Sequence, residues 1–428
     1  MLCLGVLGLE FLFLAFLVAT GTREPDALLA AFLIGIFSLA YSVYLMTHKK
    51  RYKNVWKYML TGYFIRIALL IWDLYYFDVY RLPSSHSNTE GHWAASVRYA
   101  RGFDIPRAAR KPFGIAVRYL GEQRLFIQFF MILSAIITFI VVLKIMEELE
   151  LPEKVIKIAM SLLTLLPYYA ITCSIFLMEA YPTMFSAIAL LFFVRWYKGQ
   201  GEINFLYTMI AALAAAFCHT GIITAAAGYV LVRLIYDPKT DKFHFSWRGA
   251  ILGSIMLLIF VYLFVNFAYL FSDKLSGVKS YEDIDAGVTW SAKSSYQRYV
   301  GNSKSISNII IYTPIRMIFF LFCPLPLPFM MRGLSDIIAM VFNAFFYWYT
   351  YYRAILYLRY GGKFAGLIKC ILIVGLITAF VFGWGRVDMG TVIRHRDKLF
   401  AVYVVLFAIS MTDDKKHSRR KLHPHHSL

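Results

Sequence analysis

Long apolar runs separated by short polar stretches recur along almost the whole of the 428-residue chain. A helix needs about 20 apolar residues to cross the hydrocarbon core of a bilayer. Because a lipid-exposed backbone must satisfy its own hydrogen bonds, and the alternating segments of a membrane β-barrel are absent, the pattern predicts an all-α, polytopic transmembrane helical bundle. The predicted spans lie at 3–20, 27–47, 55–77, 125–147, 156–175, 180–197, 205–218, 220–236, 249–271, 335–356, 365–384 and 399–412.

One more apolar run, 306–331, is interrupted by four prolines. The sequence leaves open whether it crosses the membrane or enters and leaves on the same side, so the bundle has about 12 or 13 spans. The whole chain, 1–428, is expected to form a single integral membrane domain. The first apolar run has no basic segment before it and no small-residue cleavage site, so we expect it to remain as a span.

The composition supports the same class of protein. Hydrophobic residues make up 60% of the chain and charged residues 16%, whereas about a quarter of the residues in soluble domains are charged. The net charge of +19 does not require a nucleic-acid partner, because Lys and Arg gather at the cytoplasmic ends of spans. The cysteines lie in apolar runs without paired spacing, which favours small core residues over a disulfide or metal site. They are Cys3, Cys173, Cys218, Cys323 and Cys370.

Basic clusters follow the second, fourth, sixth and eighth predicted spans, and all of them fit the cytoplasmic side. This orientation places a first outer loop, 78–124, and a second outer loop, 272–305, outside the cell. It places the basic tail, 413–428, in the cytoplasm. The polar stretch 385–398 then lies outside only if the run 306–331 makes no net crossing. The clusters that set this orientation lie at 48–53, 144–157, 195–198 and 233–248.

The first outer loop is rich in arginine, which opposes the usual distribution of charge across a membrane. One interpretation is a solvated amphipathic segment that forms amphipathic helices. The other is an anion site, because arginine suits phosphate and carboxylate groups, and a lipid-linked pyrophosphate is a natural ligand at a membrane surface. The candidate phosphate-binding residues of this loop are Arg107, Arg110 and Arg118.

The segment from Asn88 to His92 holds the first candidate for catalysis. Asn88 or Thr89, just before an amphipathic stretch, can cap the start of a helix, which would place Glu90 in the first turn. Alternatively, Glu90 acts as a general base for an acceptor hydroxyl, or binds a divalent metal beside His86 and His92. The spacing is not that of a strong metal motif, so no metal site is predicted.

Two other residues interrupt apolar stretches. Glu179 is a lone carboxylate at the depth or the rim of the membrane, where carboxylates are costly and usually functional, although a side chain that reaches the interface also explains it. His219 is either a core histidine or a contact for a phosphate or sugar. The second outer loop, 272–305, combines carboxylates and aromatic side chains that suit sugar binding, as they would suit any exposed loop.

A short polar stretch, 385–398, lies between two predicted spans near the C-terminus. Its cations Arg394, Arg396 and Lys398 recur at every second position. If the stretch faces outside, these cations can bind a diphosphate and stabilise it as a leaving group. If it faces the cytoplasm, they are ordinary basic residues beside a span.

Four stretches give the chain a resemblance to proteins of bacterial cell-surface polysaccharide loci, namely GT-C-like glycosyltransferases and O-antigen-polymerase-like proteins. The stretches cover most of the chain in the order of that family. Two of them are Asn88-Thr-Glu90-Gly with Tyr99-Ala-Arg-Gly102, and the turn from Pro167 through Ser174 to Glu179. The others are Thr313-Pro-Ile-Arg316 through Cys323-Pro-Leu-Pro326, and Gly390-Thr-Val-Ile-Arg394-His-Arg396.

This resemblance implies glycosyl transfer from a polyprenyl-phosphate or diphosphate carrier at the outer face of the bacterial cytoplasmic membrane. Such enzymes usually place a carboxylate base in the first outer loop, where the family's frequent Asp corresponds to Asn88 or Glu90. Arginines of the outer loops would hold the carrier phosphate. A Rossmann glycine fingerprint is absent, so no nucleotide is expected. The expected partners are the polyprenyl-linked glycan, the lipid bilayer and other polysaccharide-assembly proteins.

The resemblance, together with these residues, leads to two hypotheses of function. The first is an inverting membrane glycosyltransferase or repeat-unit polymerase, with Glu90 and Glu179 as catalytic candidates. The alternative is a transporter or flippase of lipid-linked glycans, which needs cationic sites but no base; transporters often contain internal repeats, which this sequence does not show. The use of a divalent metal stays open. Substrate or phosphate binding is assigned to Asn88, His92, Arg107, Arg110, Arg118, His219, Arg316, Arg394, Arg396 and Lys398.

Overall fold

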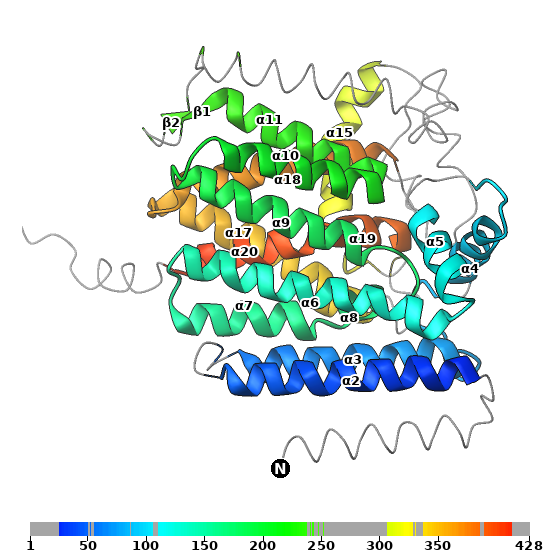
Figure 1. The fold of residues 1–428 in the computed structure, drawn as a ribbon. Coiled ribbons are helices and arrows are strands. Elements are labelled where there is room, and N and C mark those ends of the chain that lie inside the picture. Colours follow the sequence, from blue (N-terminus) through cyan, green and yellow to red (C-terminus); the bar gives the residue numbers. More distant parts are fainter. Residues whose placement is uncertain are drawn as a thin grey trace, which may run out of the picture. The chain divides into compact units, whose positions relative to one another are not determined.

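A computed structural model gives the fold of the chain (Figure 1). The described residues are mostly helical, with one two-stranded antiparallel sheet formed by β1 (Tyr236–Asp237) and β2 (Lys242–Phe243). The prediction of a helical protein is therefore confirmed for this part of the chain. The structure describes residues 25–49, 52, 55–85, 87–105, 110–237, 240, 242–243, 247, 251, 306–327, 330, 337–385 and 389–412.

Several predictions fall on residues that the structure does not describe. They concern the first predicted span, 3–20, the second outer loop, 272–305, and the basic tail, 413–428. Nearly all of the predicted span 249–271 also lies outside the described residues.

Three described helices are long and apolar enough to cross a membrane. They are Leu28–Thr47, Arg124–Glu148 and Ala365–Trp384. These helices support the prediction of a membrane protein, whereas the total number of crossings stays a prediction. Four shorter apolar helices are Ile203–Cys218, Thr220–Ile235, Ile310–Phe322 and Phe400–Ser410.

The chain divides into two compact units, and each is described by itself. Unit 1 comprises residues 1–139 and 160–180, and unit 2 comprises residues 140–159 and 181–428. Unit 1 contains α2 (Pro25–Thr47), α3 (Trp56–Tyr75), α4 (Ser87–Ala100), α5 (Lys111–Leu120), most of α6 (Arg124–Glu148), the end of α7 (Glu153–Leu165) and α8 (Pro167–Thr172). Unit 2 contains α9 (Ala180–Tyr197), α10 (Ile203–Cys218), η2 (Thr220–Ile222), α11 (Ile223–Ile235), α15 (Ile306–Phe322), η6 (Ala339–Ala344), α17 (Phe345–Tyr360), α18 (Ala365–Gly385), α19 (Met389–Asp397) and α20 (Phe400–Ser410).

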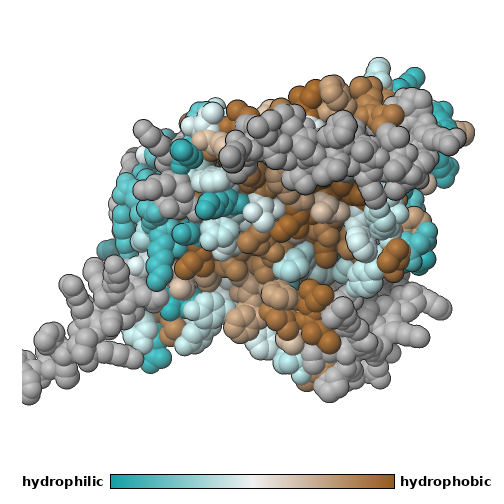
Figure 2. Space-filling view, turned by 90° about the horizontal axis from the view of Figure 1, so that it is seen from below, coloured by the Kyte–Doolittle hydropathy of each residue, from teal (hydrophilic) through white to brown (hydrophobic). Residues whose placement is uncertain are grey.

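In unit 1, α2 and α3 run side by side (Figure 1). The hydroxyl oxygens of Ser38 on α2 and Tyr63 on α3 lie 2.6 Å apart in the buried contact. Away from α3, the side chains of Leu29, Phe32 and Ile36 are exposed. Figure 2 shows hydrophobic side chains across the middle of the face seen from below, with hydrophilic ones toward its sides. Apolar surface of this extent is expected where helices face lipid.

The predicted span 156–175 is two helices, because α7 ends at Leu165 and α8 begins at Pro167. Proline has no backbone N–H and cannot continue the hydrogen-bond pattern of α7. The last carbonyl groups of a helix need other partners and carry a partial negative charge. The fully buried Arg66 of α3 supplies one, since its Nη1 donates to Thr164 O at 2.7 Å.

In unit 2, α20 is the central helix, because every residue from Phe400 to Ser410 is buried. α18 packs against α11 and α15. Glycines allow these close contacts: a Cβ at Gly228 would lie 2.9 Å from Val374 Cα, and one at Gly383 would lie 3.1 Å from the carbonyl oxygen of Arg316. Small residues are typical of closely packed membrane helices.

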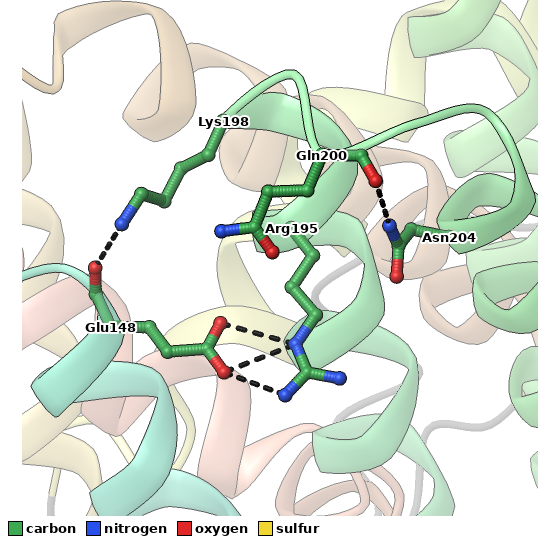
Figure 3. A network of polar contacts seen from close by, with 5 residues as sticks. All are labelled: Glu148, Arg195, Lys198, Gln200 and Asn204. Carbon is green, nitrogen blue, oxygen red and sulfur yellow. Dashed lines mark hydrogen bonds and ion pairs between the residues drawn. The ribbon is translucent and has the colours of Figure 1, made fainter.

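A polar network joins the ends of α6 and α9 within unit 2 (Figure 3). Glu148 accepts hydrogen bonds from Arg195, with Nη2 at 2.7 Å and Nε at 3.0 Å from Oε1. Lys198 donates to the backbone carbonyl of Glu148, and Asn204 donates to the carbonyl of Gln200 at 2.8 Å. These are the helix ends that the basic residues predict to face the cytoplasm.

Several buried hydroxyl groups are bonded within their own helices. Thr138 in α6 donates to Ser134 O at 2.8 Å, and Thr378 in α18 donates to Val374 O at 2.9 Å. Each hydroxyl bonds the carbonyl four residues earlier, so it needs no partner from another helix. Ser42, Thr208 and Thr350 follow the same pattern.

Candidate functional site

The first polar cluster, called the loop cluster, comprises Asp73, Ser85, Glu90, Arg124 and Gln128 of unit 1. It lies where α3 ends, α4 begins and α6 begins. The helices α4 and α5 of the predicted outer loop pack together beyond the ends of α3 and α6 (Figure 1). A Cβ at Gly114 of α5 would lie 2.5 Å from the Tyr99 ring of α4, so the glycine permits this contact.

Glu90 and Arg124 form a two-point ion pair in this cluster. Nη1 of Arg124 lies 2.7 Å from Oε2 of Glu90, and Nη2 lies 2.7 Å from Oε1. Parallel hydrogen bonds of this kind fix the orientation of a carboxylate. The Glu90 side chain is still 48% exposed, and the guanidinium of Arg124 lies 5.9 Å from the centre of the Trp93 ring. The carboxylate is therefore both oriented and accessible.

Asp73 is a second carboxylate in the loop cluster, and the sequence prediction missed it. It is buried near the end of α3 and accepts hydrogen bonds from Ser85 and, at 2.9 Å, from Gln128 Nε2. Gln128 also donates to Ser174 O at 2.8 Å. The sequence does carry a signal for Asp73, which is the single charged residue of the apolar stretch Ile71-Trp72-Asp73-Leu74. Ionisable residues in spans mark functional sites.

The other candidate residues of the first predicted outer loop differ in their surroundings. Arg110 Nε lies 3.0 Å from His92 Nδ1, so these two candidates meet. Asn88 and Arg118 are exposed at the start of α4 and near the end of α5. Arg107 and His86 lie outside the described residues.

Glu179 lies in the turn after α8 and is buried. The residue before it, Met178, has a φ of 67°, a left-handed backbone conformation that is uncommon for a residue with a side chain. Upstream in the same turn, Phe176 packs edge-on against Trp93 of α4 and Phe113 of α5. The turn that contains Glu179 is thus connected by aromatic contacts to the helices that carry Glu90 and Arg118.

The second polar cluster, called the α19 cluster, is in unit 2 and contains most of the C-terminal polar stretch. Arg396 is buried, and its Nη1 donates to the carbonyl groups of Leu321 at 2.8 Å and Cys323 at 2.7 Å. Its Nη2 donates to Asn343, and its guanidinium lies 4.2 Å from the centre of the Tyr347 ring. Through these contacts, Arg396 holds α19 against the end of α15.

Asp397 is buried beside Arg396. Asn343 Nδ2 donates to both of its carboxylate oxygens at 3.0 Å, and Tyr347 OH donates to Oδ1 at 3.0 Å. Burial raises the pKa of Asp397 to about 6, while Arg396 and these hydrogen bonds act in the opposite direction. Asp397 lies in the predicted polar stretch 385–398, whereas Asn343 and Tyr347 lie in the predicted span 335–356 and were not predicted as site residues.

Three nitrogen bases meet in the same cluster. The rings of His219 and His395 have centroids 4.6 Å apart, and both contact Phe382. Lys398 is buried and its Nζ lies 2.8 Å from His395 Nδ1. The structure therefore brings together the candidates His219 and Lys398, which are far apart in the sequence. A cluster of basic side chains such as these favours an anionic ligand.

Arg394 is half-buried on α19 and Arg316 is buried on α15. Arg394 Nη2 donates weakly to Thr391 Oγ1 at 3.3 Å, and its Nε has no hydrogen-bond partner among the described residues. The Arg316 guanidinium lies 3.9 Å from the centre of the Trp384 ring. Arg394 is more available to a ligand than Arg396, because Arg396 is buried and its Nη groups already donate to Leu321, Cys323 and Asn343.

No group of three or more His, Cys, Asp or Glu side chains that could hold a metal ion is found in the part of the chain that the structure describes. The described cysteines Cys173, Cys218, Cys323 and Cys370 form no disulfide with one another. In their described residues, the two clusters lack the donor set of a metal centre.

Comparison of the chain with models of protein families, with curated proteins and with solved structures gives no match.

Proposed function

We propose that the chain is an inverting glycosyltransferase or repeat-unit polymerase of the bacterial cytoplasmic membrane that uses a polyprenyl-phosphate- or diphosphate-linked sugar. The Glu90–Arg124 pair is the observation that carries the proposal. It presents an oriented and accessible carboxylate next to an apolar helix of membrane-spanning length. A carboxylate in this position can take a proton from the hydroxyl of an acceptor sugar.

In the proposed reaction, the acceptor hydroxyl gives its proton to Glu90 while its oxygen bonds to the anomeric carbon of the donor sugar. The bond between that carbon and the carrier phosphate oxygen breaks, and its electron pair leaves with the polyprenyl phosphate or diphosphate. A single displacement of this kind inverts the anomeric configuration. Because the leaving group is charged, fixed cations stabilise the transition state.

Not all of the cations predicted from the sequence are suited to stabilising the leaving phosphate. Arg110 and Arg118 lie on or next to α5, in the loop that also holds Glu90. Within unit 2, Arg394, Lys398 and His219 are candidates for a separate phosphate-binding site of that unit. Arg396 is bonded to backbone carbonyl groups and Asn343, so we propose that it positions α19 and does not contact the phosphate.

The proposal is tested with the full-length protein in vesicles and a synthetic polyprenyl-diphosphate-linked sugar. Replacing Glu90 by Gln should lower turnover by about 10²–10⁴-fold, the usual contribution of a general base. Donor binding should be retained, since the substitution removes the base and leaves the cations. Release of the polyprenyl carrier measures turnover, and native mass spectrometry measures binding.

Glu122→Gln is the matched control. Glu122 is an exposed acid of the same loop and lies 2.7 Å from Arg101, so it also forms an ion pair with an arginine. Its replacement should leave turnover unchanged. Equal losses in the two variants would mean that Glu90 acts through loop stability, which would refute its role as base.

A transporter or flippase of lipid-linked glycans is the second candidate. Helix discontinuities favour it: α7 and α8 are broken at Pro167, α15 contains Pro314, and a π-helical turn precedes α17. Broken helices are typical of transporter binding sites. A flippase would move a fluorescent lipid-linked sugar between leaflets without releasing the carrier, and Glu90→Gln would not change that rate.

A further inference from the structure

We propose that α5 lies along the surface of the membrane that α6 crosses, with its exposed apolar side chains at the boundary between the headgroups and the acyl chains. The partner is the lipid bilayer itself. This inference does not depend on the proposed enzymatic activity. It rests on the two apolar faces of α5, on the short connection to α6 and on the charges around α5.

α5 has one apolar face inside the protein and another outside it. Phe113, Gly114 and Val117 are buried, and Gly114 contacts Tyr99 of α4. On the other face, the exposed fractions are 47% for Ile115 and 80% for Tyr119. These two residues are four positions apart and therefore share one face of the helix. An ordinary solvated helix does not need this second apolar face.

The connection between α5 and α6 limits how far α5 can lie from the bilayer. α5 ends at Leu120 and α6 begins at Arg124, with three residues between them. An extended chain of this length spans at most about 14 Å. α6 is a candidate membrane span over its whole length, Arg124–Glu148. Leu120, itself 44% exposed, is therefore within reach of the interfacial region, which is about 5–8 Å thick on each side.

The charges around α5 complement anionic lipid headgroups. Lys111 is paired with Asp104 at 3.0 Å, and Arg101 is paired with Glu122. No ion pair engages Arg118 in the described part of the chain, and Arg118 lies next to the exposed apolar face. An apolar face flanked by cations is the pattern of helices that lie in the membrane interface.

The test uses the full-length protein with its native cysteines replaced by alanine. A single cysteine is introduced by Tyr119→Cys and labelled with an environment-sensitive fluorophore. The protein is reconstituted in vesicles of phosphatidylcholine and phosphatidylglycerol, some of which carry nitroxide groups on the acyl chains. Asn88→Cys, at an exposed polar position of α4, is the matched control. Ile115→Cys is a second probe of the apolar face.

We expect blue-shifted emission and several-fold stronger nitroxide quenching at positions 119 and 115 than at position 88. Adding Arg118→Glu should reduce the quenching at 115 in vesicles that contain phosphatidylglycerol and have little effect in pure phosphatidylcholine. Water-like emission with equal quenching by aqueous iodide at all three positions would overturn the proposal. Blue-shifted emission without nitroxide quenching would also overturn it, because the face would then contact protein.

Discussion

The amide nitrogen of Asn343 lies 3.0 Å from both carboxylate oxygens of Asp397, so a residue of the π-helical turn before α17 binds the acid at the end of α19. The carbonyl oxygen of the same side chain accepts a hydrogen bond from Arg396. One neutral side chain thus serves two buried charges of opposite sign. Because buried charges are tolerated only when hydrogen bonds satisfy them, Asn343 is central to this part of unit 2.

Replacing Asn343 by Leu should strongly destabilise the protein. The substitution leaves Asp397 and Arg396 buried without their shared partner, and breaking a buried charge network of this kind costs about 3–5 kcal/mol. The thermal unfolding midpoint in detergent, followed by intrinsic fluorescence, measures the effect.

Thr378→Val is the control for this substitution. It removes a buried hydroxyl that, among the described residues, bonds the carbonyl of Val374 in its own helix, so the loss should be below about 1.5 kcal/mol. If the two variants unfold at the same temperature, the network around Asn343 contributes little to stability.

The stability of the protein should fall as pH rises from about 4 to about 6 because of Asp397. Burial raises the pKa of this carboxyl to about 6 in the folded chain, above its ordinary value of 3.8. Between these values the folded state holds more protons than the unfolded state, so the free energy of unfolding falls as pH rises, by up to about 3 kcal/mol.

Asp397→Asn removes this titration, and the difference in unfolding midpoint between the two proteins isolates it from other groups. The wild-type protein should lose stability relative to the variant as pH rises through this range. Parallel curves for the two proteins would contradict the raised pKa.

Replacing Gly62 by Ala should separate α3 from the end of α7. An added Cβ would lie 2.8 Å from both the Cβ and the carbonyl oxygen of Thr164, where Arg66 also binds. Overpacking of this kind costs about 1–3 kcal/mol. Gly91→Ala on α4 is the matched change in open space, and it should stabilise its helix by about 0.5–1 kcal/mol. Thermal midpoints that shift in the same direction would argue against the close contact.

Arg394→Gln should weaken the binding of a synthetic polyprenyl phosphate by about 10–150-fold, which corresponds to the loss of one charged hydrogen bond. Native mass spectrometry or thermophoresis gives the dissociation constant. Arg233→Gln, which removes a cation paired with Glu202 at 3.3 Å in the same unit, should have little effect. A similar loss in both variants would indicate general attraction between the protein and the anion.

The sequence predicts helices well where apolar runs are long and uninterrupted. The predicted span 125–147 corresponds to α6, Arg124–Glu148, and the predicted span 27–47 corresponds to α2, Pro25–Thr47. The predicted span 156–175 is not one continuous helix, because the apolar run continues through Pro167 although the hydrogen bonds of a helix cannot. Hydropathy records composition and is insensitive to a single missing N–H group.

The partners of polar residues were much harder to predict. Glu90 was identified as a candidate, but its partner Arg124 is 34 positions away and no local pattern joins them. Arg396 and Lys398 were treated as equivalent cations. Residues two positions apart point in different directions from a helix, so each meets its own partners in the folded chain. The sequence therefore indicated where polar chemistry gathers, but not which charges are already used by the protein.

The hydroxyl groups that bond carbonyls of their own helices also matter for biosynthesis. A serine or threonine such as Thr138 or Thr378 has its hydrogen bond as soon as its helix exists. It can enter the bilayer without waiting for a neighbouring helix, because the penalty for a bare polar group in hydrocarbon is already avoided. Arg396 has no such local solution: its partners on α15 and in the π-helical turn are more than 50 residues away in the sequence. Helices with such hydroxyls can therefore be inserted into the bilayer one at a time. In contrast, α19 can pack in its final position only after α15 and the π-helical turn have been inserted.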